Sequence, residues 1–233
     1  MTIQNSPEYY PIELLHWAAM PDINLYMIED ILLFHPEYIN YTNKDGDNSL
    51  MIAARVGNVE IVKFFLEKTN INFEQCSNQG DFFMIALHYG HKKLAELIFN
   101  DFSDKINPQR LNNKKENFFH LAALKGYDFI FEDYCFGEHI NQLDIKNQHC
   151  LFNFVEGYPY HLNYWCFQLI QENFNPDFLF LKNKDNETIL EYIYQLIKKS
   201  KISTENHNGY DSVVYEPILN ILNSLKSRLE API

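Results

Sequence analysis

The segment from Asn43 to Lys68 reads NKDGDNSLMIAARVGNVEIVKFFLEK and contains a turn, two apolar stretches and a glycine between them. Its central motif is an apolar residue that leads into a short run with small residues at its end. The motif recurs in Leu15–Ala19, Leu50–Ala54, Phe83–Leu87 and Phe119–Ala123, with weaker copies that begin at Leu151 and Ile189. The opening residues stand 35, 33, 36, 32 and 38 positions apart. This spacing indicates a repeat protein in which each copy is one structural unit.

The segment resembles an ankyrin repeat almost position by position. Gly46 takes the place of the turn glycine, Asn48–Met51 that of the first helix start, and Ala53–Ala54 that of the paired alanines. Gly57 separates the helices, and Ile61–Leu66 forms the apolar second helix. The resemblance implies an all-α fold, an ankyrin-repeat solenoid of about six helix-turn-helix repeats with divergent capping repeats.

Recurring residues also predict where the helices begin and end. Side chains that can accept a hydrogen bond from a free helical N–H group are expected to be N-caps, namely Asn48, Asp81 and Asn117. Glycines that can adopt the left-handed conformation are expected to end the first helices, namely Gly57, Gly90 and Gly126. His16 and His120 follow the leading apolar residues and are interpreted as hydrogen-bonding groups at helix starts.

An Ile-Asn dipeptide follows each second helix and resembles the Val-Asn pair of the family. Its asparagines are expected to tie the following loop together, and they are Asn40, Asn72, Asn107 and Asn141. Asn40 and Asn141 also resemble the loop asparagines that an asparaginyl hydroxylase modifies in ankyrin domains.

We expect one continuous domain over residues 1–233, because each repeat of a solenoid packs only on its neighbours. The expected repeats are 11–42, 43–77, 78–112, 113–145, 146–181 and 182–233. The first begins with helices near Glu13–Met20 and Leu25–Phe34. In the fifth, residues 156–161 predict a remodelled turn between the helices. The sixth carries a polar insertion at 200–212, interpreted as a surface loop.

Composition excludes several classes of protein. The net charge is −12, and no Lys/Arg cluster is long enough for a phosphate-binding stripe, so no nucleic acid is expected as a partner. An acidic chain favours a basic partner surface. No apolar run reaches about 20 residues, so no membrane span is expected. The four cysteines are widely separated, and the first residues lack a secretory pattern, which predicts reduced thiols and a cytoplasmic location.

The sequence contains no recognised catalytic motif, and we expect no enzyme activity, no cofactor and no metal. Two Cys/His pairs, His149 with Cys150 and Cys135 with His139, are interpreted as structural, because the residues fall in separate parts of the repeat. His88 and His91 could form at most a weak surface metal pair.

The resemblance implies a function in the loop tips and the exposed sides of the first helices, which form a concave groove in ankyrin proteins. The expected partner-binding residues are Lys44, Asp45, Asp47, Arg55, Val56, Asn78, Gln79, His88, Tyr89, Lys114, Lys115, Leu124, Lys125, Lys146, Gln148, Tyr158 and Tyr160. Further tip residues are Lys184, Asp185 and Asn186. Arg55, Tyr89 and Lys125 are the preferred anchors.

The leading hypothesis is a non-enzymatic protein-interaction module, an adaptor or inhibitor that acts as a monomer. The Asn-, Ile- and Lys-rich composition resembles that of ankyrin effectors that intracellular bacterial pathogens deliver into host cells, which implies a host protein as the partner. The alternative is an effector enzyme whose active site lies in the region 156–215. A third reading, a scaffold for self-assembly, would need a large exposed apolar patch.

Overall fold

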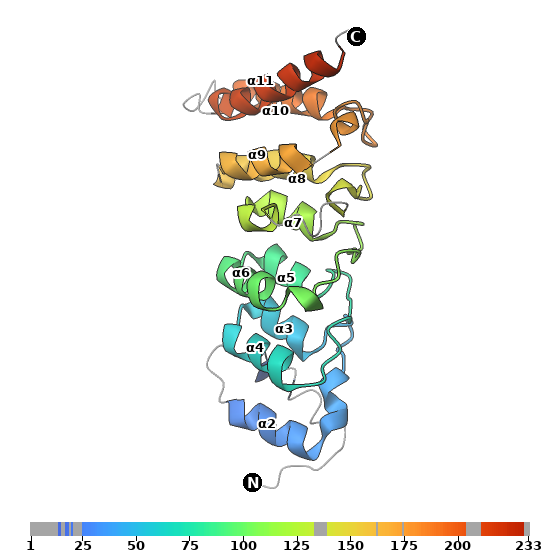
Figure 1. Ribbon diagram of the computed structural model, residues 1–233, viewed down its shortest axis with the longest axis vertical. Helices are drawn as coiled ribbons and strands as arrows, with labels where there is room; N and C mark the ends of the chain where they lie inside the picture. The colour runs from blue at the N-terminus through green and yellow to red at the C-terminus, as the bar shows by residue number, and fades with distance from the viewer. Residues whose placement is uncertain are drawn as a thin grey trace. The chain divides into compact units, whose positions relative to one another are not determined.

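A computed structural model gives the structure of the protein. It describes residues 14, 17, 18, 20, 25–132, 139–161, 163–173, 175–203 and 211–230. The regular elements among these residues are α-helices and short 3₁₀ helices (Figure 1). The expectation of an all-α repeat fold is therefore confirmed. The chain divides into two compact units, Met1–Asn113 and Lys114–Ile233.

The first unit consists of helix pairs that follow the repeat period. Leu14, Trp17 and Ala18 are helical, as the expected first helix requires. The elements that follow are α2 (Leu25–Phe34), η1 (Pro36–Asn40), α3 (Ser49–Val56), α4 (Val59–Lys68), α5 (Phe82–Tyr89), α6 (Lys92–Asp101) and η2 (Ser103–Lys105). The second helix of each pair returns against the first because a left-handed glycine separates α3 from α4 and α5 from α6.

The second unit continues the pattern with less regular pairs. Its elements are α7 (Phe118–Lys125), η3 (Asp128–Ile130), α8 (Cys150–His161), α9 (Tyr164–Asn173), η5 (Pro176–Leu179), α10 (Ile189–Ser203) and α11 (Asp211–Leu229). After α7 the chain forms the 3₁₀ turn η3. Residues 133–138, which include Cys135 of the expected second helix, lie outside the described residues.

The predicted helix ends are confirmed. Asn48, Asp81 and Asn117 each accept a hydrogen bond from a backbone N–H in the first turn of the helix that follows. His120 completes a capping box with Asn117, because its Nδ1 atom accepts the Asn117 backbone N–H. The three glycines end α3, α5 and α7 with φ angles of 77°, 82° and 66°.

Two predictions for the second unit are wrong. The turn expected at residues 156–161 is absent, since α8 continues to His161. Gly157 does not end the helix. A Cβ atom at this position would lie 1.9 Å from the carbonyl oxygen of Leu124, so the glycine lets α8 approach α7 closely. The loop expected at 200–212 is helical at both ends, because α10 extends to Ser203 and α11 begins at Asp211. Residues 204–210 lie outside the described residues.

The core of each unit is built from the apolar positions of the motif. Leu50, Phe83, Phe119, Leu151 and Leu190 are all buried, and the small residues beside them allow close helix packing. The isoleucines of the Ile-Asn pairs are also buried, whereas their asparagines are exposed or half-buried. The asparagines tie the loops together as expected: Asn40 Oδ1 accepts the Asn72 N–H at 2.6 Å, and Asn141 Oδ1 accepts the Asn175 N–H at 3.0 Å.

Candidate functional site

The loops that precede the first helices lie along one side of the helices in each unit (Figure 1). Three of their turns share one construction. Asn43 Oδ1 accepts the backbone N–H groups of Asp45 and Asp47 at 2.9 and 3.0 Å. Asp144 and Asn183 make the same pair of bonds in the loops before α8 and α10. These side chains fix the loop tips, so the exposed residues on them are held in defined positions.

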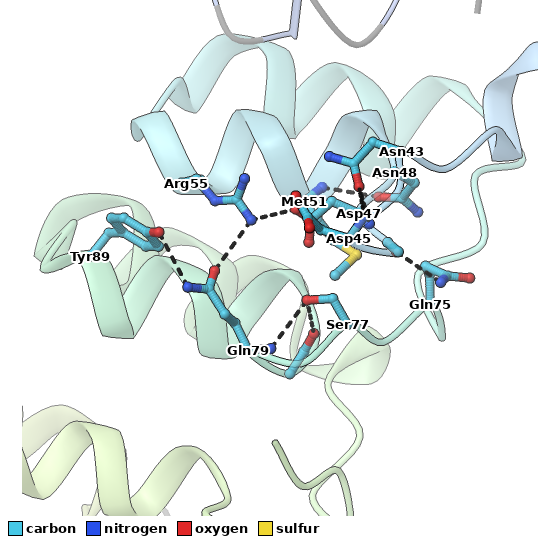
Figure 2. A network of polar contacts seen from close by, with 12 residues as sticks. Asn43, Asp45, Asp47, Asn48, Met51, Arg55, Gln75, Ser77, Gln79 and Tyr89 are labelled. Carbon is cyan, nitrogen blue, oxygen red and sulfur yellow. Dashed lines mark hydrogen bonds and ion pairs between the residues drawn. The ribbon is translucent and has the colours of Figure 1, made fainter. Parts of the chain in front are cut away.

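Four side chains from two successive repeats form a connected group in the first unit, which we call the loop network (Figure 2). Arg55 Nη2 donates to Asp47 Oδ2 and, at 3.2 Å, to Gln79 Oε1. Gln79 Nε2 in turn donates to the Tyr89 hydroxyl at 3.3 Å. The Arg55 guanidinium carbon lies 5.8 Å from the centre of the Tyr89 ring, within range of a cation–π contact. The network joins the end of α3 to the loop and helix of the next repeat.

The loop network borders a surface hollow of about 330 Å³. Its lining residues are Asp45, Asp47, Arg55, Ser77, Asn78, Gln79 and Tyr89. The Asp47 side chain is fully buried, and its Oδ1 atom has no hydrogen-bond partner among the described residues. The hollow therefore combines hydrogen-bonding groups with one aromatic ring, a combination suited to polar side chains of a protein partner.

His91 supports the same region from the next repeat. Its Nε2 atom lies 2.8 Å from the carbonyl oxygen of Arg55. Gly57 is necessary for this contact, because a Cβ atom there would lie 2.5 Å from His91 Nδ1. The His91 side chain thus holds the end of α3. The described residues contain no group of three or more His, Cys, Asp or Glu side chains that could hold a metal ion.

The structure brings together several of the predicted partner-binding residues but gives them different roles. Lys44, Asp45 and Asn78 are exposed on loop tips, and Tyr89 is 43% exposed at the end of α5. Val56 and His88 are exposed beside them. Asp47, however, is buried, and its carboxylate forms an ion pair with Arg55.

The predicted partner-binding residues of the second unit differ in their exposure. Lys114, Lys115 and Lys146 are exposed, whereas Leu124 and Lys125 are half-buried. Gln148 is only 5% exposed, so, like Asp47, it offers little surface to a partner. The side chains of Tyr158 and Tyr160 lie outside the described residues.

His149 and Cys150 are adjacent and buried in the second unit, whereas Cys135 lies outside the described residues. Cys150 Sγ lies 3.6 Å from His149 Nδ1, but burial raises the pKa of the Cys150 thiol and lowers the pKa of His149 to about 3. Burial therefore favours the neutral form of both groups near pH 7. His149 Nδ1 accepts the Leu151 backbone N–H at 3.1 Å and so caps the start of α8.

Sequence reasoning missed the loop-fixing residues Asn43, Asp144 and Asn183. A signal for them exists in the sequence, because each stands six positions before the first residue of the helix that follows. It also missed the bond from the Tyr192 hydroxyl to Glu156 Oε1 at 2.7 Å, which joins α10 to α8. These two residues stand 36 positions apart, close to the repeat period.

A second exposed surface lies on α2. Tyr26, Leu33 and Phe34 are 72%, 73% and 74% exposed there. A cavity of about 620 Å³ adjoins this helix and is lined on its other side by α4. Within the described part of the chain, no helix combines the length and the apolar composition needed to cross a membrane.

A comparison with known protein families identifies the repeats of the first unit. The family model for ankyrin repeats, in three copies, matches residues 15–112. These residues are therefore ankyrin repeats, and the helices of the second unit continue the same pattern.

Several known proteins share part of this sequence or the fold. The NAD-capped RNA hydrolase NUDT12 of Macaca fascicularis is 30% identical over 126 residues, which are 53% of this chain and 27% of that protein. The Start control protein cdc10 of Schizosaccharomyces pombe is 37% identical over 65 residues, which are 27% of this chain and 8% of that protein. The chain thus spans about a quarter or less of these relatives.

Among solved structures, the fold is similar to that of a chain in the complex of Bd0816 predatory endopeptidase from Bdellovibrio bacteriovorus with immunity protein Bd3460. The TM-score is 0.64 at 22% identity, and the match covers 83% of this chain and 97% of that chain. At this identity the likeness supports the fold alone.

Proposed function

We propose that the protein is a non-enzymatic interaction module that binds a partner protein, as a monomer, through its loop tips and the exposed ends of its first helices. The observation that carries this proposal is the loop network, which fixes Arg55, Gln79 and Tyr89 beside a hollow before any partner arrives. Fixed side chains lose little conformational entropy on binding, and Arg and Tyr are enriched where binding energy concentrates.

The comparisons support a protein partner in general terms. Ankyrin repeats expose long contact surfaces, and the structural neighbour comes from a complex between two proteins. The composition adds the further proposal that the partner is a host protein and the chain a bacterial effector located in the cytoplasm of the host cell. The alternative, an enzyme with its active site in 156–215, has no described group of residues to which a reaction can be assigned.

The test is affinity capture of a partner with a variant that changes only exposed groups of the hollow. Asp45→Lys/Tyr89→Ala serves this purpose, because it leaves the ion pair of Arg55 with buried Asp47 intact. Replacing Arg55 would leave a buried carboxylate without its cation and would report on folding instead. The matched control is Tyr26→Ala/Asp30→Lys, which makes the same two changes on exposed positions of α2.

We expect the wild-type protein and the α2 variant to capture the same partner from a lysate and the hollow variant to lose it. Equal thermal unfolding of the three proteins shows that the loss concerns binding. Retention by the hollow variant with loss by the α2 variant would move the binding surface to α2, and failure of the wild-type protein to capture any partner would overturn the proposal.

A further inference from the structure

The second unit contains eleven Lys and Arg residues, of which six lie on its helices and five on its loops. Five lysines lie on the loops that precede α7, α8 and α10, and all five are exposed; we call them the lysine row: Lys114, Lys115, Lys146, Lys182 and Lys184. The whole chain carries a net charge of −12. The loops therefore present a charge opposite to that of the protein as a whole.

Backbone hydrogen bonds place these lysines side by side. The carbonyl oxygen of Lys114 accepts the Ile145 N–H at 2.6 Å, and that of Lys146 accepts the Lys184 N–H at 2.9 Å. Asn147 Nδ2 donates to the carbonyl oxygen of Lys182 at 2.8 Å. Each loop is thus bonded to the next, so the backbones of Lys114, Lys146 and Lys184 follow one another from the first loop to the third.

The carboxylates of the same loops neutralise the lysine row only in part. Glu116 is 8% exposed. Asp144 is half-buried, and its Oδ1 atom accepts two backbone N–H groups at 2.8 Å. Glu187 is also half-buried, which leaves Asp185 as the exposed carboxylate among the described residues of these loops. The loops therefore expose five lysines and one carboxylate, and Glu191 at the start of α10 adds a second exposed carboxylate that interacts with Lys182.

We propose that the lysine row binds an acidic segment of the partner protein. This inference rests on the proposed function and specifies its chemistry: a stretch rich in Asp and Glu that runs across the three loops. Ammonium groups on flexible stems can follow carboxylates without a fixed bidentate geometry, so an extended acidic peptide suits the row. The overall acidity of the chain favours a basic partner, but the loops, where contact is expected, favour an acidic one.

A protein segment fits this surface better than a nucleic acid. A protein partner can present carboxylates to the row and neutral or basic residues to the acidic remainder of the chain. A nucleic acid is negative along its whole length and would be repelled by that remainder. Single-stranded DNA therefore serves as the competing probe.

The test measures binding of a fluorescein-labelled Glu-rich peptide by fluorescence anisotropy, with the Gln counterpart of that peptide and oligo-dT as comparisons. The variant is Lys146→Glu/Lys184→Glu. Its control is Lys198→Glu/Lys199→Glu, which makes the same charge change on exposed positions of α10. Lys146→Gln/Lys184→Gln provides a milder pair if the charge reversal affects folding.

At about 50 mM salt we expect the wild-type protein and the α10 variant to bind the Glu-rich peptide equally and the row variant to bind about tenfold more weakly. The Gln peptide should not bind. Equal weakening in both variants, absence of binding by the wild-type protein, or tighter binding of oligo-dT would each overturn the inference. A partner captured through the first unit would survive any of these results, so failure here is distinguishable from failure of the proposed function.

Discussion

The Nε2 atom of His91 lies 2.8 Å from the carbonyl oxygen of Arg55, so a histidine of one repeat holds the end of the first helix in the preceding repeat. The bond satisfies a carbonyl near the helix end, where no helical partner is available. The Arg55 side chain organises the loop network, so the bond also holds the backbone from which this side chain extends. Positioning of the hollow therefore depends on a residue that does not line it.

Gly57→Ala should disturb this contact. The variant should therefore lose more stability than the cost of placing alanine at a positive φ angle. Alanine at a φ of 77° costs about 1–2 kcal/mol, and its Cβ atom would also displace the His91 ring. Gly46→Ala is the matched control, because its φ is 84° but its nearest neighbouring atom would lie 3.9 Å away.

Urea unfolding of both glycine variants measures the difference. We expect Gly57→Ala to lose about 1 kcal/mol more than Gly46→Ala, and His91→Ala in the Gly57→Ala background to remove most of that excess. Equal losses in the two single variants would show that the His91 ring yields without cost.

Asp81→Asn should stabilise the protein at neutral pH. Burial raises the pKa of the Asp81 carboxyl from 3.8 to about 6, against the opposing effect of its bonds to backbone N–H groups. The folded state therefore binds the proton more tightly than the unfolded state. The contribution of Asp81 to stability is fully present below pH 3.8 and is lost as the pH rises through about 6. Asparagine keeps the cap, as Asn48 and Asn117 do, without the buried charge.

The free energy of unfolding as a function of pH provides the measurement. At about pH 7.5 we expect Asp81→Asn to gain on the order of 1–3 kcal/mol, and near pH 4 to differ little from the wild-type protein. Asp101→Asn, at an exposed position of α6, should show no such dependence. A loss of stability at pH 7.5 would mean that the hydrogen bonds of the charged carboxylate to the helix start stabilise the protein by more than burial of the charge costs.

Gly157→Ala tests why α8 continues where the sequence predicted a turn. Within a helix, alanine is favoured over glycine by about 1 kcal/mol, so the variant would be stabilised if helix propensity alone mattered. The new Cβ atom would lie 1.9 Å from the Leu124 carbonyl oxygen, and α8 would have to move away from α7. We expect a net loss of about 2 kcal/mol in thermal or urea unfolding. A gain in stability would contradict the close packing of the two helices.

Gly157 also shows which parts of the fold the sequence could predict. Helix caps such as Asn48 and left-handed glycines such as Gly57 act through local backbone chemistry, so they could be recognised without tertiary information. Gly157 serves a contact with a helix one repeat away. In the sequence, a glycine that ends a helix and a glycine that allows two helices to pack closely look the same. Only the packing of α7 against α8 shows that Gly157 is of the second kind.

The candidate site was predictable to a similar extent. Arg55 and Tyr89 stand 34 positions apart, so the repeat period indicated that they lie in adjacent repeats near the same helix end. The burial of Asp47 and the contact of His91 with Arg55 were not predictable, because both depend on how neighbouring repeats pack. The lysine row required the hydrogen bonds between loops, which align lysines that are far apart in the sequence.

Lys115→Asn should raise stability and weaken binding of an acidic peptide at the same time. Lys115 has a φ of 59° and occupies the same loop position as Gly46, Asn147 and Asn186, whose φ angles are 84°, 62° and 64°. Asparagine adopts this conformation more readily than lysine, so we expect a gain of about 0.5–1 kcal/mol in the free energy of unfolding. The change also removes one charge of the lysine row and should weaken the Glu-rich peptide about twofold.

The reciprocal variant is Asn186→Lys, on an exposed tip of the loop before α10. It should lose a similar amount of stability, because it places a lysine at a positive φ, yet bind the Glu-rich peptide about twofold more tightly. Urea unfolding and fluorescence anisotropy on the two variants measure both quantities. If stability and affinity changed in the same direction in each variant, the peptide would be responding to the folding of the loops and not to their charge.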